Sequence, residues 1–117
     1  MEFEKEQAIY LQIAELICEN ILSGEWTEEE RIPSVRELAV TTEVNPNTAM
    51  RSYAWLQEKG IIQNRRGIGY FVSGGALEKT QTLKKLDFIN NQLPQLFKMM
   101  DLLNIRFDEL KSLYDNH

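Results

Sequence analysis

Two helix-start signals lie close together in the middle of the chain and constrain its fold most. Ser34 stands three residues before Glu37, a capping box in which each side chain binds the other residue's backbone N–H. Asn45 followed by Pro46 marks the second start, because Asn is a favoured N-cap and Pro fits the first helical position. The two starts predict one short helix that begins at Ser34, a tight turn over residues 41–44, and a second helix that begins at Asn45.

A longer helix is expected before this pair, over residues 5–23, with Gly24 as its stop. A helix that is apolar on two faces is expected to pack on both. Cys18 is interpreted as a small buried hydrophobe rather than a redox sensor. The larger face comprises Ile9, Ile13, Leu16, Ile17 and Ile21, and the smaller one Leu11, Ala14, Cys18 and Leu22.

A hairpin is expected after the pair. The helix that begins at Asn45 should bury Ala49, Tyr53 and Leu56 and end at Gly60. Strand-like runs over residues 61–64 and 70–73 are joined by a five-residue connection with two glycines, which suits a hairpin loop. Two helices, a tight turn and a hairpin predict a winged helix-turn-helix over residues 1–75, in which the second helix of the pair enters the major groove of DNA.

Residues 76–117 are predicted to form a helical dimerisation region, so that the fold is mainly α with a small β hairpin. Apolar residues recur there at intervals of three and four, a heptad pattern typical of paired helices. Pro94 should kink this helix, and residues 104–106 are a candidate break. The predicted seam is Leu86, Ile89, Leu93, Leu96, Met100, Leu103, Phe107, Leu110 and Tyr114.

Charge is distributed unevenly along the chain. Residues 1–30 carry Lys5 against nine Glu, a net charge of −8, whereas residues 31–75 carry six basic side chains against three Glu, a net charge of +3. The 117 residues together have a net charge of −5, which would normally argue against a polyanionic partner. The locally basic middle keeps nucleic acid as a candidate partner.

Residue usage excludes several function classes. A single cysteine excludes an internal disulfide and a cysteine-cluster metal site, and a single histidine, His117, argues against a catalytic triad or a His-ligated metal. We therefore predict no enzymatic activity, no cofactor and no metal. The longest apolar runs are four residues and no apolar segment follows Met1, so neither a membrane span nor a secretory signal is expected, and the predicted location is the cytoplasm.

The candidate DNA-reading side chains lie on the outward side of the helix that follows Pro46. Asn47, Thr48 and Arg51 are on the side away from Ala49, and such groups can reach base edges and phosphates. The N-terminus of the helix itself attracts a phosphate.

Short motifs run through residues 9–72 in a characteristic order. They are Tyr10-Leu11-Gln12-Ile13, Ile32-Pro33-Ser34-Val35-Arg36-Glu37-Leu38-Ala39, Val44-Asn45-Pro46-Asn47-Thr48, Arg51-Ser52-Tyr53, Leu56 with Gly60-Ile61-Ile62, and Arg65-Arg66-Gly67-Ile68-Gly69-Tyr70-Phe71-Val72. Their order and spacing together resemble the GntR family of bacterial transcription regulators, and specifically its short YtrA-like branch.

The resemblance implies a homodimeric repressor that binds a palindromic double-stranded operator and, for the YtrA-like branch, control of a transporter operon. Arg36 matches the family's base-contacting arginine, Thr48 its contacting threonine, and Arg66-Gly67 the wing tip that enters the minor groove. Pro46 and Met50 stand where many members carry arginine, so the operator cannot be copied from larger subfamilies. The predicted DNA-binding residues are Ser34, Arg36, Asn45, Asn47, Thr48, Arg51, Arg65, Arg66 and Gly67.

A rival class is a winged-helix protein-interaction module that binds no DNA, and the acidic N-terminal segment favours it. Arg36 could simply pair with Glu37 or Glu43, and Arg65 and Arg66 could be ordinary hairpin charges. Thr48 could only support the Asn45 cap, and Trp26, Trp55 and Tyr53 are interpreted as packing residues. Residues 28–30 are interpreted as a solvated acidic loop. The sequence identifies no small-molecule effector.

Overall fold

The computed structural model describes residues 8–117, and the chain divides into two compact units. One unit extends to Gln81 and the other comprises Thr82–His117. The described chain is mainly helical with a single two-stranded antiparallel sheet, which confirms the predicted fold class. The predicted start of the first helix, residues 5–7, lies outside the described residues.

Three helices make up most of the first unit: α1 (Ile9–Leu22), α2 (Val35–Thr42) and α3 (Pro46–Glu58), with α3 packed against the other two. The two predicted apolar faces of α1 form a single broad buried face. Ile13, Ile17 and Ile21 of the larger face lie next to Ala14 and Cys18 of the smaller face around the helix. Ile9 and Leu16, assigned to the larger face, lie at its edge and are exposed. The buried residues are Ile13, Ala14, Ile17, Cys18 and Ile21.

The capping box at the start of α2 is confirmed. The Glu37 N–H donates to Ser34 Oγ at 3.1 Å, and the Ser34 N–H donates to Glu37 Oε1 at 2.9 Å. The turn after α2 is shorter than predicted, since Thr41 and Thr42 remain helical and their hydroxyls donate to carbonyls one turn earlier. Glu43, with φ of 57°, ends the helix in the left-handed conformation.

The start of α3 is also confirmed, with Asn45 Oδ1 accepting the Asn47 N–H at 2.7 Å and Pro46 in the first turn. Gly60, with φ of +76°, follows the end of the helix. Ala49, Tyr53 and Leu56 are buried as predicted. The inward face has a fourth member, Ser52, whose hydroxyl donates to the Tyr10 carbonyl at 2.7 Å and joins α3 to α1.

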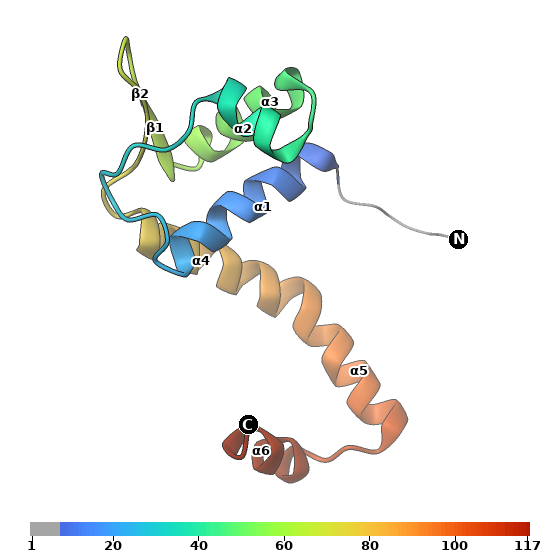
Figure 1. The fold of residues 1–117 in the computed structure, drawn as a ribbon. Coiled ribbons are helices and arrows are strands. Elements are labelled where there is room, and N and C mark those ends of the chain that lie inside the picture. The colour runs from blue at the N-terminus through green and yellow to red at the C-terminus, as the bar shows by residue number, and fades with distance from the viewer. Residues whose placement is uncertain (1–7) are drawn as a thin grey trace. The chain divides into compact units, whose positions relative to one another are not determined.

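The wing is the hairpin of β1 (Ile62–Arg65) and β2 (Gly69–Val72), which extends away from the helices of its unit (Figure 1). Both strands lie one residue from the predicted bounds. Ile61 is not part of β1, because its N–H donates to the Leu56 carbonyl and closes the end of α3, although its carbonyl accepts the Ser73 N–H at 3.0 Å. Arg65 pairs with Gly69, so the loop is the three residues 66–68.

The acidic segment at residues 28–30 is an exposed loop, as predicted, but it is also hydrogen-bonded to distant parts of the chain. The Glu28 carboxylate accepts the Gly75 and Leu77 N–H groups at 2.9 and 3.3 Å, at the start of α4 (Ala76–Asp87). The Glu29 N–H donates to the Val72 carbonyl, and the Val72 N–H donates to Glu30. The segment therefore joins β2 and the start of α4 through hydrogen bonds that local sequence patterns do not reveal.

The second unit contains the end of α4, a π-helical turn over Phe88–Gln92, α5 (Leu93–Leu103) and α6 (Phe107–Asp115). The π turn ends two residues before Pro94, whose missing N–H removes an α-helical hydrogen bond at this point. The candidate break is confirmed, since Asn104 is left-handed with φ of 58°. The predicted seam is therefore divided between helices rather than continuous.

No residue between 82 and 117 is buried within its own unit. Leu93, Met100 and Leu110 of the predicted seam are half-buried, and its other members are exposed. None of the helices in the described part of the chain is long and apolar enough to cross a membrane.

Candidate nucleic-acid interface

The outward face of α3 presents a continuous line of exposed residues opposite the buried face. Asn47, Met50, Arg51 and Ala54 are all exposed, at positions i, i+3, i+4 and i+7, and we call them the α3 stripe. The stripe combines an amide, a guanidinium and two apolar side chains near the N-terminal half of the helix. Such a surface can approach the edges of base pairs.

The first turn of α3 is held by its own cap. The Thr48 N–H donates to the Asn45 carbonyl at 2.9 Å, and the Asn45 side chain accepts the Asn47 N–H. Asn45 is therefore committed to the cap through its side-chain oxygen, and Thr48 takes part through its backbone. The Thr48 side chain is half-buried beside the stripe.

Aromatic rings fix the orientation of α3 and of Arg51. The Arg51 guanidinium lies 4.0 Å from the centroid of the Tyr10 ring on α1. Tyr53 donates its hydroxyl to the Pro33 carbonyl at 2.6 Å and packs edge-on against Tyr70 of the wing, with centroids 4.8 Å apart. Tyr53 thus joins α3 to the segment before α2 and to β2.

Burial makes the Tyr53 hydroxyl harder to ionise. Removal of its hydroxyl from water raises the pKa of Tyr53 well above its usual range, and the nearby Tyr70 and Glu37 add to the effect. The phenol, which is neutral at physiological pH in any case, therefore keeps its proton for the bond to Pro33 to a higher pH than an exposed tyrosine would.

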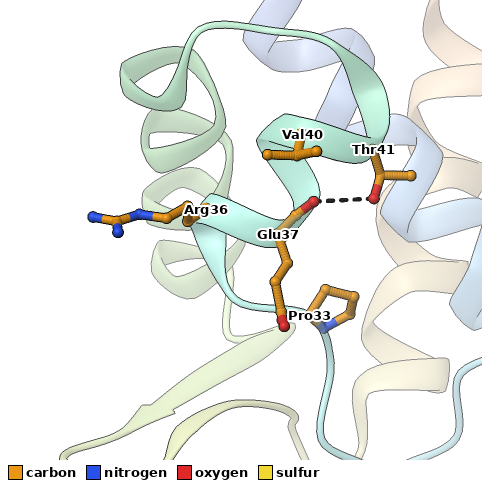
Figure 2. Close-up of a pocket in the computed structure, with 5 residues that line it drawn as sticks. All are labelled: Pro33, Arg36, Glu37, Val40 and Thr41. Carbon is orange, nitrogen blue, oxygen red and sulfur yellow. Dashed lines mark hydrogen bonds between the residues drawn. The ribbon is translucent and has the colours of Figure 1, made fainter.

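Arg36 extends from the exposed side of α2 (Figure 2). It borders a pocket of about 560 Å³, but its side chain points away from Pro33, Glu37, Val40 and Thr41, which line the rest (Figure 2). Within the described residues no salt bridge joins it to Glu37 or Glu43, and the Glu37 carboxylate is occupied by the Ser34 N–H. Ser34 itself uses its hydroxyl oxygen as a cap acceptor.

The two wing arginines have different environments. Arg65 Nη2 lies 2.5 Å from Glu29 Oε1, and its guanidinium lies 4.0 Å from the centroid of the Phe71 ring. Arg65 is thus held against the base of the wing. Arg66 and Gly67 are exposed at the tip, where Gly67 has φ of +78° and a Cβ there would meet nothing within 4 Å. The tip is therefore open to a close approach by a partner.

Arg31 is a wing residue that sequence reasoning missed. It forms an isolated β-bridge with Phe71, and its Nε lies 3.0 Å from the position that a Cβ on Gly69 would occupy. The wing therefore carries three arginines, Arg31, Arg65 and Arg66. In the sequence, the one hint of this role is that Arg31 stands directly before Ile32, which is buried. A single bridge gives no strand-like pattern, so the pairing with Phe71 could not be predicted.

The described residues contain no group of three or more His, Cys, Asp or Glu side chains that could hold a metal ion. The exposed groups instead come from α2, from α3 and from the wing tip. Two helices joined by a tight turn and followed by a β wing define the class of the protein: a winged helix-turn-helix.

Comparison with known proteins identifies the family. The model of the bacterial regulatory proteins of the gntR family matches residues 9–72. The HTH-type transcriptional regulator YhcF of Bacillus subtilis (strain 168) is 35% identical over 111 residues, which cover 93% of this chain and 88% of that protein. The HTH-type transcriptional repressor YtrA of the same organism is 40% identical over 88 residues, which cover 75% and 67%.

Solved structures agree with this assignment. A transcriptional regulator of the GntR family from Bacteroides thetaiotaomicron superposes with a TM-score of 0.78 at 46% identity, covering 93% of this chain and 95% of that chain. The AraR DNA-binding domain in complex with an operator superposes with a TM-score of 0.58 at 26% identity, covering 62% and 88%. The chain belongs to the GntR family of bacterial transcriptional regulators, which are DNA-binding proteins and not enzymes.

Proposed function

We propose that the protein is a homodimeric repressor that binds a palindromic operator. The observation that carries the proposal is the arrangement of the first unit. The cap residues, Tyr53 and Ser52 are committed to internal hydrogen bonds, whereas Arg36, the α3 stripe and the wing tip stay exposed. Groups that support the fold are thus separate from groups that are available to a partner.

In this proposal each predicted DNA-binding residue has a distinct role. The N-terminal half of α3 enters the major groove, with Asn47 and Thr48 at base edges, and Arg36 contacts a base from α2. Arg66 and Gly67 enter the adjacent minor groove. Arg51, held on Tyr10, contacts a phosphate, and Arg65 positions the wing through Glu29 and Phe71. Ser34 and Asn45 orient the two helix starts beside the phosphate backbone.

The second half of the proposal divides the chain at Gly75 into a DNA-binding domain, residues 1–75, and a dimerisation region, residues 76–117. Support comes from the apolar surface of α5 and α6, because large exposed apolar patches mark interaction sites. Leu96, Leu103 and Phe107 are 38, 61 and 72% exposed. A second copy that covers these residues would remove them from water.

Repression and the choice of target rest on the relatives. YtrA is named a transcriptional repressor, and the YtrA-like resemblance supports a transporter operon as the regulated unit. A chromosomal operator would place the protein in the cytoplasm. No small-molecule effector is assigned.

The direct test is an electrophoretic shift of the full chain with the promoter of its own operon, titrated with salt. We expect a specific complex whose log affinity falls linearly with log salt, since neutralised phosphates release counterions. A promoter of scrambled sequence is the matched control and should bind only weakly. Equal affinity for both DNAs, or no binding at low salt, would instead favour a winged-helix protein-interaction module.

A further inference from the structure

Met50 is the one long apolar side chain of the α3 stripe. It is 50% exposed, while the buried face of α3 is filled by Ala49, Tyr53 and Leu56. Scattered exposed hydrophobic residues are normal on a protein surface, so exposure alone assigns no role. The position of Met50 within the proposed reading surface is what distinguishes it.

Helix geometry places Met50 beside the end of α3 that faces DNA in this class of fold. Successive residues are rotated by about 100°, so Met50 lies about 60° to one side of Asn47 and Arg51 about 40° to the other. Helical side chains lean toward the N-terminus and cover the preceding turn. Met50 therefore covers the first turn of α3, from which a recognition helix contacts base edges.

The chemistry of this side chain matches one group in the major groove. Base edges there present hydrogen-bond donors and acceptors, and the C5-methyl of thymine is their apolar group. A thioether has no donor and is only a weak acceptor, so Met50 offers mainly hydrocarbon surface. Ala54, one turn further along the stripe, is small and leaves room for a base pair to approach.

We propose that Met50 is a specificity-determining residue that selects thymine by contact with its C5-methyl group. The inference rests on the proposed function, because it requires α3 to enter the major groove. Its neighbours Asn47 and Arg51 supply polar and phosphate contacts, and Met50 supplies an apolar contact at the adjacent base pair.

The test removes single methyl groups from an operator selected by the full chain from random DNA. Each thymine is replaced in turn by deoxyuridine, which deletes the methyl group and leaves the hydrogen-bonding edge unchanged. We expect one thymine per half-site whose replacement weakens binding about fourfold, as for one buried methylene-sized group, and about 15-fold when both half-sites are changed.

Variants of the protein assign this sensitivity to a residue. Met50→Ala should bind the thymine and deoxyuridine operators equally at that position, and Met50→Leu, which keeps the hydrocarbon, should retain the difference. Val40→Ala is the matched control, because Val40 is 73% exposed but lies on α2. Its deoxyuridine profile should equal that of the wild type, and thermal melting should show all variants folded.

The possible failures are distinguishable. If the wild type selects an operator but no thymine is sensitive to deoxyuridine, or the sensitivity persists in Met50→Ala, the role of Met50 is wrong and the proposed function stands. A wild-type chain that selects no DNA sequence would overturn both.

Discussion

Among individual residues, the proposed DNA contacts differ in how freely they can move. Arg65 is held by Glu29 and Phe71, and Arg51 is held by Tyr10. Arg36 is exposed on α2, with the neighbouring Glu37 carboxylate committed to the capping box. Arg36 can therefore reorient toward a base without breaking an internal ion pair with Glu37.

Arg36→Ala should weaken operator binding by about 1–3 kcal/mol and relax preference at one base position per half-site, because a bidentate base contact would be lost. Arg36→Lys is the matched control: it keeps the charge but not the planar fork, so it should retain non-specific affinity and lose the preference. Competition shifts against single-base operator variants measure both quantities. A folded Arg36→Ala protein with wild-type affinity and preference would refute the assignment.

Tyr53 gives a prediction about stability. Its pKa is higher in the folded than in the unfolded chain, so the stabilisation from the neutral phenol is complete below about pH 10 and decreases as the pH rises above that value. Tyr53→Phe should cost about 1–2 kcal/mol at neutral pH, because the Pro33 carbonyl loses its donor.

Denaturant unfolding of both proteins from pH 7 to 11 checks this prediction. The difference in unfolding free energy between wild type and Tyr53→Phe should shrink above pH 10. A difference that stays constant across this range would mean that the Tyr53 hydroxyl is not the group responsible. Tyr114→Phe, at an exposed position of the second unit, controls for the general effect of removing a phenol.

At the scale of elements, helix starts were predictable and long-range contacts were not. Ser34 and Asn45 cap their helices through residues two or three positions away, so local sequence carries the whole signal. Glu29 and Arg65 lie far apart in sequence, and their pair depends on the folded wing. The predicted bounds of both strands are wrong by one residue. Four residues of alternating pattern do not specify which residue begins the hydrogen-bonded ladder.

In the candidate site, too, features set by local sequence were predictable and features set by tertiary contacts were not. Exposure of Arg36, Asn47 and Arg66 followed from helix periodicity and from the hairpin loop. Arg31 was missed because a single bridge to Phe71 leaves no periodic pattern. The separate roles of Arg65 and Arg66 required the positions of Glu29 and the ring of Phe71, which are brought to the wing by tertiary structure.

The different environments of Arg65 and Arg66 lead to a prediction about the wing. Arg66→Ala should lower the slope of log affinity against log salt by about one unit per lost phosphate contact per subunit. Arg65→Ala should leave that slope close to wild type and cost up to about 1 kcal/mol of stability, because it removes a partly exposed ion pair.

Salt titrations and urea unfolding of the two variants separate these effects. An unchanged slope for Arg66→Ala together with a lost A·T preference would assign Arg66 to minor-groove reading instead of phosphate binding. If Arg65→Ala lowers the slope as much as Arg66→Ala, the structural role proposed for Arg65 is wrong.

For the whole molecule, the proposal requires two copies at a fixed separation. One winged helix contacts only a few base pairs, and half-sites one turn apart are separated by about 34–36 Å. The first unit buries its own apolar face, whereas residues 82–117 contain no buried residue. The apolar surface that remains for a second copy is therefore concentrated in the second unit.

Leu96→Glu combined with Leu103→Glu should produce monomers and weaken operator binding severely, while the first unit stays folded. Both side chains are on the predicted seam and exposed, at 38% and 61%, so the substitutions place charges in the interface without disturbing a buried core. Lys98→Glu changes the net charge by the same two units on the opposite side of α5, where Lys98 is exposed, and should stay dimeric. Sedimentation measures the oligomeric state and a shift assay on the same preparations measures operator affinity. A Leu96/Leu103 variant that remains dimeric contradicts the dimer proposal, as does a monomer that binds the full palindrome as tightly as wild type.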